Sequence, residues 1–336
     1  MNKDEVSTGA GLSVSLGLWQ DRPAAEALAT ARLADELGYD ELWLGEMATY
    51  DVFALATAVA GVTERIPLTV GPLAVTVRDP ATIAMGVASV RALTGRRVTV
   101  ALGTSSTVVV EEWHGRSRAR AGVALAESAR QTRELLDGAR SDGRGSVLRS
   151  RGYRLRLPAP GGSGLTVAAF GPAAIRTAAR YADRLVLNLV SVETAGELIG
   201  SLERAAEGAG RPRPRVAAWV CAAVEAKPGA AVAEGTEQLR RGLVGYLAAP
   251  GYAEMFARAG FAELVAYART RPRPRELWAA IPPSAVSAVG VVGSVAHARE
   301  RIAAYRGVGV DEVVLVPAAT AGDPAGAATL SALSGG

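Results

Sequence analysis

Short apolar stretches alternate with longer amphipathic ones along nearly the whole chain, and this alternation restricts the fold more than any other feature. The stretch 22–38, for example, has Pro23 near its first turn and Gly38 just past its end, which is typical of a helix. The expected strands are residues 12–19, 40–46, 66–75, 96–103, 165–171, 182–190, 215–224 and 310–317. Eight strand–helix units in 336 residues predict an α/β fold, a (β/α)8 TIM barrel.

Two segments depart from this rhythm. Residues 146–158 resemble a small hairpin, and residues 229–285 form a helical insertion in the C-terminal half that contains an expected solvated loop, 269–275. We expect a single domain over 1–336 with a flexible N-terminus, 1–11. A doubly wound sheet is the alternative, but it requires a glycine fingerprint after the first strand, and "LGLWQDRP" has none.

Charge and cysteine content exclude several classes of function. The 37 basic residues face 33 acidic ones and are scattered, so a nucleic-acid partner is disfavoured. Cys221 is the single cysteine, and with two histidines it cannot build a metal site or a disulfide framework. No apolar run reaches the ~18 residues of a membrane span, and the first residues lack an apolar signal core. We expect a soluble, cytoplasmic protein without a membrane partner.

In such a barrel the functional groups lie where the strands end at the C-terminal face. The fourth strand ends in Gly103, which lets a ligand approach the backbone, and in three hydroxyl residues, Thr104, Ser105 and Ser106. The fifth ends in small residues and a helix start: Ala169, Phe170, Gly171 and Pro172. Both ends are candidate phosphate cradles. Ordinary helix caps are the alternative interpretation.

Two titratable residues near these ends are candidates for proton transfer. Glu46 ends the second strand and could accept a ligand hydrogen bond or move a proton, or it could be a capping or salt-bridged acid. His114 lies in the loop after the fourth strand and is a candidate substrate contact, whereas His297 is expected on an outer helix. Asp51 is expected to cap the helix that follows it. No Ser-His-Asp arrangement is apparent.

Five stretches, in order, resemble the luciferase-like superfamily and most closely its branch dependent on coenzyme F420, a deazaflavin. They are "LADELGYDELWLGE", "VGPLAVTVRDPATIA", "GRRVTVALGTSSTVVVEEWHG", "AAFGPAAIRTAARYAD" and "ERIAAYRGVGVDEVVLVP". The resemblance implies a barrel with an insertion, a homodimer, and a coenzyme at the C-terminal face.

The resemblance also explains why Gly71-Pro72 interrupts an apolar strand, where both residues weaken pairing. It implies a bulge with a cis peptide bond behind the coenzyme ring, at Gly71, Pro72 and Leu73. A cis bond is far less costly before proline than elsewhere. The alternative is a trans bond in an edge-like kink.

Carried over residue by residue, the resemblance implies that Glu46 lies near the ring. Gly103–Ser106 and Ala169–Pro172 would hold the phosphate and ribityl chain. Met47 stands where some relatives have a histidine that donates a proton, so Glu46, His114 or water would have to replace it.

The implied function is hydride transfer between F420 and a small organic or natural-product substrate, including a peptide. Reduction of an activated C=C or C=N bond, as in a dehydroamino acid, is the favoured direction. An FMN-dependent monooxygenase is the alternative, and a cis bond at Gly71-Pro72 would favour the deazaflavin. A barrel that binds a metabolite without catalysis, and a non-redox enzyme acting on a phosphate ester, are further alternatives.

Overall fold

Eight parallel strands close into a barrel, as the alternation predicts. The computed structural model describes residues 11–17, 23–157, 162–225 and 231–335. Within them the barrel strands pair in the order β1-β2-β3-β4-β5-β6-β7-β9, and β9 pairs with β1 to close the ring. Their bounds are β1 (Gly11–Ser15), β2 (Leu42–Leu44), β3 (Leu68–Ala74), β4 (Val98–Gly103), β5 (Leu165–Ala168), β6 (Arg184–Asn188), β7 (Arg215–Glu225) and β9 (Glu312–Pro317).

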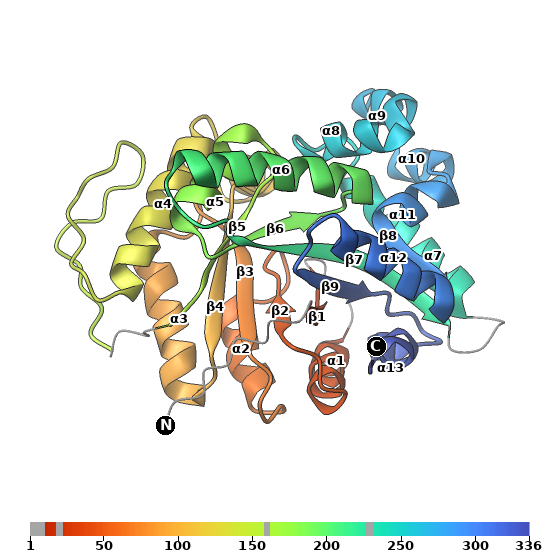
Figure 1. Cartoon of the computed structure of the whole chain (residues 1–336), viewed down its shortest axis with the longest axis horizontal. Helices are drawn as coiled ribbons and strands as arrows, with labels where there is room; N and C mark the ends of the chain where they lie inside the picture. The colour runs from red at the N-terminus through yellow and green to blue at the C-terminus, as the bar shows by residue number, and fades with distance from the viewer. Residues whose placement is uncertain (1–10, 18–22, 158–161, 226–230, 336) are drawn as a thin grey trace.

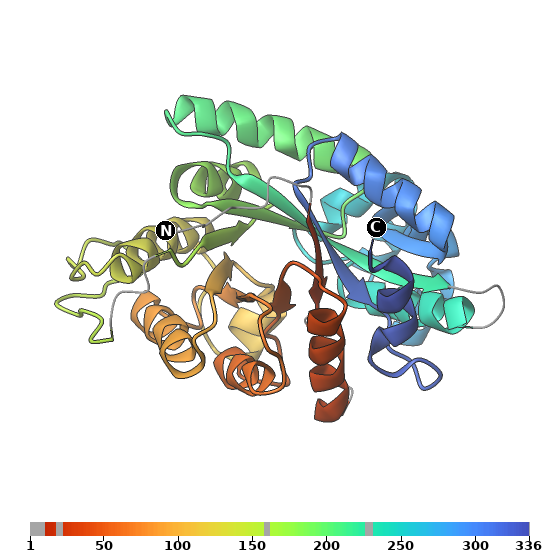
Figure 2. The same cartoon turned by 60° about the horizontal axis from the view of Figure 1, so that its bottom comes forward.

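Helices surround this barrel because each strand is followed by an amphipathic segment whose apolar side packs on the sheet (Figures 1 and 2). Asp51 caps α2 through the amides of Phe53 and Ala54, as predicted. The surrounding helices are α1 (Ala24–Glu36), α2 (Val52–Ala60), α3 (Pro80–Thr94), α4 (Ala121–Leu136), α5 (Pro172–Tyr181), α6 (Val192–Gly208), α12 (Val295–Gly307) and α13 (Ala327–Leu333).

The strands are apolar on both faces because they separate two packed regions. The larger region lies between strands and helices and contains fully buried residues such as Leu73 and Leu102. The smaller one fills the barrel with two large rings, Trp43 and Trp219, which meet edge to face at 5.8 Å, and with smaller residues. Those smaller residues are Ala101, Val186, Ala217 and Val314.

An ionic network closes the N-terminal end of the barrel. Arg184 Nη1, at the start of β6, donates to Glu41 Oε2 and Glu312 Oε2, each at 2.5 Å, and its Nη2 donates to Thr69 Oγ1 at 2.8 Å. All four side chains are buried. The pKa of Glu41 is lowered because the Arg184 charge and its hydrogen bonds outweigh the opposing effect of burial. One guanidinium therefore links β6 to the starts of β2, β3 and β9.

The segment 229–285 carries a run of short helices on one side of the barrel, drawn in cyan to blue in Figure 1. They share an apolar cluster of their own that includes Leu247, Phe256 and Val286. Residues 229 and 230 of the expected insertion lie outside the described residues. The helices are α7 (Ala231–Gly242), η2 (Leu243–Gly245), α8 (Tyr252–Phe256), η3 (Ala257–Phe261), α9 (Ala262–Arg269), α10 (Pro274–Ala280) and α11 (Pro283–Val289).

A ninth strand, β8 (Gly290–Ser294), follows these helices and was not predicted. It pairs only with the C-terminal half of β7, from Cys221 to Glu225. β7 is eleven residues long, and its first half pairs with β6 and β9 inside the barrel. One continuous strand therefore belongs to both the barrel and the insertion.

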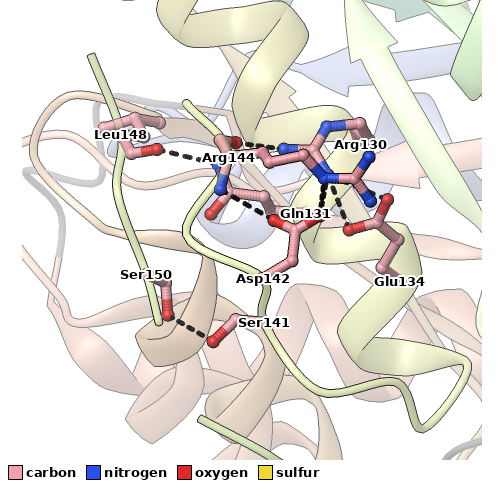
Figure 3. A network of polar contacts seen from close by, with 8 residues as sticks. All are labelled: Arg130, Gln131, Glu134, Ser141, Asp142, Arg144, Leu148 and Ser150. Carbon is pink, nitrogen blue, oxygen red and sulfur yellow. Dashed lines mark hydrogen bonds and ion pairs between the residues drawn. The ribbon is translucent and has the colours of Figure 1, made fainter. Parts of the chain in front are cut away.

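The hairpin predicted over 146–158 is wrong. In the part described, the loop after α4 contains one antiparallel bridge, between Asp142 and Arg151, and no strand. Side chains of α4 hold this loop instead (Figure 3): Gln131 Nε2 donates to Leu148 O at 2.9 Å, and Arg130 donates to Arg144 O. Residues 1–10 of the expected flexible N-terminus, residue 158 of the hairpin and Trp19 lie outside the described residues. No helix of the described residues is long and apolar enough to cross a membrane.

Candidate active site

Strand β3 contains the predicted irregularity at its C-terminal end. Its register with β4 shifts between Val70 and Leu73, and the Gly71-Pro72 bond is cis, as predicted. Gly71 has φ +113°, and a Cβ there would lie 2.3 Å from the Ala101 carbonyl oxygen. Only glycine fits this position, because any side chain would overlap the neighbouring strand.

The bulge presents Pro72 to the next two strand ends. A Cβ added to Gly103 would lie 3.3 Å from Pro72 Cβ and 3.6 Å from Ala168 Cβ. These three residues, Pro72, Gly103 and Ala168, form an uncharged surface of small side chains that we call the floor. The side chain of Leu73 is fully buried in the core between strands and helices, so only its backbone could contact a ligand at the floor.

Glu46 is held in a salt bridge, which matches its alternative interpretation. Its Oε1 accepts from Arg78 Nε at 2.7 Å, and its Oε2 accepts from Arg78 Nη2 at 2.6 Å and from the Val52 amide at 3.0 Å. Arg78 also binds Asp51. The hydrogen bond to Glu46 keeps the pKa of Arg78 above its ordinary value. A carboxylate fixed in this fork is suited to positioning rather than to donating a proton.

The hydroxyl residues after β4 are also engaged within the chain. Ser106 Oγ accepts from the Val109 amide at 3.2 Å, as a capping side chain does, and the helix that follows, η1 (Val108–Trp113), is a short π-helix. Arg118 Nε donates to the Ser105 carbonyl at 2.9 Å, and its Nη2 donates to Thr104 Oγ1 at 3.3 Å. Arg118 therefore brings a positive charge to this strand end, and this contact was not predicted from the sequence.

The end of β5 keeps the open helix start that the sequence predicts. Gly171 precedes α5 with φ −80° and ψ 158°, and a Cβ there would meet nothing within 4 Å. Pro172 is the first residue of the helix, and Ala169 is buried beneath it. Phe170 is half-buried and turns toward the insertion. His114 is exposed at the end of η1, so it is not enclosed with the floor, and His297 lies on the outer helix α12, as expected.

An aromatic wall from the insertion stands beside this strand end and was not predicted. Tyr252, the first residue of α8, packs edge-on against Phe170 at 4.9 Å and against Tyr246 at 4.8 Å. Its Oη accepts from Asn188 Nδ2, at the end of β6, at 3.0 Å. In the sequence, Asn188 is marked by its position at a strand end, whereas Tyr252, which lies 64 residues further on, is interpreted as a core residue of the insertion.

The sequence pattern of the luciferase-like monooxygenase family matches residues 5–312. The chain belongs to this family. Luciferase-like proteins with that pattern are oxidoreductases. In this member, the β3 bulge and the open strand ends lie at the end of the barrel where the sequence predicts the site. In the described residues no cluster of three or more histidine, cysteine or acidic side chains could hold a metal ion.

Relatives and solved structures extend this assignment. A Mycobacterium tuberculosis protein, named provisionally as a coenzyme F420-dependent oxidoreductase, is 25% identical over 339 residues, covering 92% of this chain and 96% of its own. The F420-dependent tetrahydromethanopterin reductase of Methanopyrus kandleri has the same fold, with a TM-score of 0.79 at 17% identity over 97% of this chain and 98% of its own. The FMN complex of the oxygenating component of 3,6-diketocamphane monooxygenase from Pseudomonas putida has a TM-score of 0.71 at 18% identity, covering 97% of each chain.

Proposed function

We propose that this luciferase-like protein is an F420-dependent oxidoreductase that transfers a hydride between the deazaflavin and a small organic or natural-product substrate. The observation that carries the proposal is the floor, where the β3 bulge sets Pro72 against Gly103 and Ala168 at the C-terminal face. An uncharged surface of small residues is compatible with a planar ring. The full-length similarity to a relative named for F420 supports the same coenzyme.

The residues present fit such a coenzyme. A side chain larger than hydrogen at Gly103 would begin to fill the space above the floor, and Gly171 leaves the start of α5 bare. The amides of that helix start and the guanidinium of Arg118 would hold an anionic chain. When bound, the deazaflavin supplies hydride, two electrons at once. The protein then has to orient the substrate, exclude water and provide a proton.

Reduction of an activated C=C or C=N bond is the direction we propose, because Met47 and the locked Glu46 leave no basic residue to take a proton from an alcohol at this strand end. A dehydroamino acid is one such substrate. The homodimer implied by the resemblance and the cytoplasmic location expected from the composition stay predictions, and sedimentation of the purified protein would test the first.

Titration of the apo-protein with F420 and, separately, with FMN tests the coenzyme. Quenching of ligand fluorescence with micromolar or tighter affinity for F420, and much weaker affinity for FMN, is the expected result. The reverse preference would replace the proposal with the alternative function, an FMN-dependent monooxygenase, which the structural similarity to the Pseudomonas putida enzyme favours. Binding of neither would remove the coenzyme assignment altogether.

A further inference from the structure

The Tyr252 hydroxyl is a candidate hydrogen-bond donor at this end of the barrel. The side chain is half-buried and lies where β5, β6 and the insertion meet, between Phe170 and Asn188. A phenol has one donor and can also accept. Because Oη accepts the Asn188 amide, its own proton remains available to another group. Packing of the ring against Phe170 and Tyr246 fixes the direction of the C–O bond.

The hydroxyl also keeps its proton under ordinary conditions. Burial raises the pKa of Tyr252 to about 12, against the smaller opposing effect of the hydrogen bond from Asn188. At neutral pH this phenol is therefore an acid and a hydrogen-bond donor, never a base.

Other candidate donors near the floor are less suitable. Both oxygens of Glu46 are bound by Arg78, and His114 is exposed beyond η1. The Cys221 thiol, at the end of the barrel part of β7, is half-buried, and burial raises its pKa to about 12 as well. A thiol is a much weaker hydrogen-bond donor than a phenol, so it cannot polarise a carbonyl to the same extent.

We propose that Tyr252 is the proton donor of the reaction and that it recognises a neutral, planar substrate with a carbonyl conjugated to the bond that is reduced. The inference rests on the proposed function. In the step, the β carbon of the substrate would accept the hydride that a bound deazaflavin supplies, the C=C electron pair would move to the carbonyl oxygen, and Tyr252 would give its proton to that oxygen. The enol so formed would become the saturated carbonyl product by proton exchange with water. Water then returns a proton to the tyrosinate, so one hydride and one proton are consumed per double bond.

The neutral character of the substrate follows from the side chains of the floor and from those that contact Tyr252. The floor residues Pro72, Gly103 and Ala168, and the wall residues Phe170 and Asn188, carry no charge. An ionised substrate group placed among them would lose hydration without gaining an ion pair. A conjugated carbonyl instead gains one hydrogen bond and the contact of flat surfaces with aromatic rings.

A chromophoric enal tests the donor without the coenzyme. The absorption band of 4-(dimethylamino)cinnamaldehyde moves to longer wavelength when its carbonyl accepts a strong hydrogen bond. We expect a red shift when this probe is mixed with wild-type apo-protein, and loss of the shift with Tyr252→Phe, which keeps the ring but removes the hydroxyl. Tyr267→Phe, at an exposed tyrosine of α9 outside the aromatic wall, is the matched control and should retain the shift.

Turnover of the same enal with reduced F420 provides the second measurement. Tyr252→Phe should lower kcat at least tenfold and leave the F420 dissociation constant within a factor of two, whereas Tyr267→Phe should change neither. No shift with wild-type protein, or an equal shift with Tyr252→Phe, would overturn the inference. Because the spectral test uses apo-protein, failure of F420 to bind would refute the proposed function alone.

Discussion

At the residue scale, the pair Glu46–Arg78 shows how one ion pair fixes two strand ends. Glu46 follows β2 and Arg78 follows β3, and their bidentate contact is largely shielded, with 19% of each side chain exposed. The same guanidinium reaches the cap of α2 through Asp51. The pair therefore determines where the loops beside the floor lie.

Removal of this guanidinium should cost more than removal of an exposed one. We expect Arg78→Ala to lower the free energy of unfolding by about 1–3 kcal/mol, because Glu46 would keep its burial without its partner. Arg258→Ala is the matched control: its pair with Glu197 is exposed, and the expected cost is about 0–1 kcal/mol. Urea denaturation of both variants measures the difference, and equal costs would contradict a special role for Arg78.

A second substitution at this scale separates binding from stability at the start of α5. Gly171→Asp should leave the protein as stable as wild type, because the position is open and Asp is a favoured cap. Its charge should nevertheless weaken F420 binding at least tenfold if an anionic chain lies there. Gly171→Asn caps equally well without charge and should bind within threefold of wild type. Identical F420 affinities for the two variants would show that no anionic chain binds at this helix start.

At the element scale, the β3 bulge depends on a single glycine. Gly71→Ala places a methyl group on the Ala101 carbonyl at a φ of +113°, so we expect a loss of roughly 3 kcal/mol or more, or failure to fold. Gly208→Ala, near the end of α6, meets nothing within 4 Å and should stay within about 1 kcal/mol of wild type. Thermal unfolding of both variants provides the measurement; a wild-type-like Gly71→Ala would show that the bulge can relax.

The loop after α4 should loosen in acid. Burial opposes ionisation of Glu127, but the amides of Leu148, Ser146 and Val147 lower its pKa from 4.5 to about 2. A lowered pKa gives a contribution that is complete above pH 4.5, declines below it and is lost as the pH falls through about 2. The protection of amides 146–148, taken relative to the intrinsic exchange rate at each pH, should therefore fall across this window. Glu127→Gln should show fast exchange already at pH 6, and slow exchange in that variant would contradict the assignment.

The elements that could be predicted are those whose sequence carries their own signal. The barrel strands are apolar on both faces and are bounded by helix caps, so each is recognisable alone. β8 has only Val291 and Val292 between glycines, too little to distinguish it from a loop. The segment 146–158 alternates like a strand, but its polar groups meet Glu127 and Gln131 of α4, which local pattern cannot reveal.

The residues of the candidate site likewise include some that the sequence predicted and some that it did not. Gly71, Gly103 and Gly171 were predicted because glycine at a strand end is visible in the sequence and in the family resemblance. Tyr252 and Arg118 were missed because their partners depend on where the insertion and the loop after β4 fold back. Long-range contacts made by single side chains leave no periodic pattern.

For the whole molecule, the Arg184 network controls closure of the barrel. Arg184→Met would leave Glu41 and Glu312 buried without a cation, and we expect a loss of about 3–5 kcal/mol at neutral pH. In wild type the lowered pKa of Glu41 contributes stability above its unfolded pKa that is lost on acidification. The variant lacks that contribution, so the difference in the free energy of unfolding between wild type and variant should become smaller as the pH falls. Denaturant midpoints measured at pH 7 and at about pH 3, below the ordinary Glu pKa of 4.5, test this, and a difference from wild type that stays constant would contradict it.

The shared strand β7 has a consequence for how such enzymes diversify. Its first half pairs with β6 and β9. Its second half pairs with β8, which follows the helices that contribute the aromatic wall. If the segment between Cys221 and Ser294 were replaced by that of another family member, its position would be set by the first half of β7, which pairs with β6 and β9 of the recipient. Exchange of this one segment could then change the range of substrates, while the floor in the recipient barrel stays unchanged.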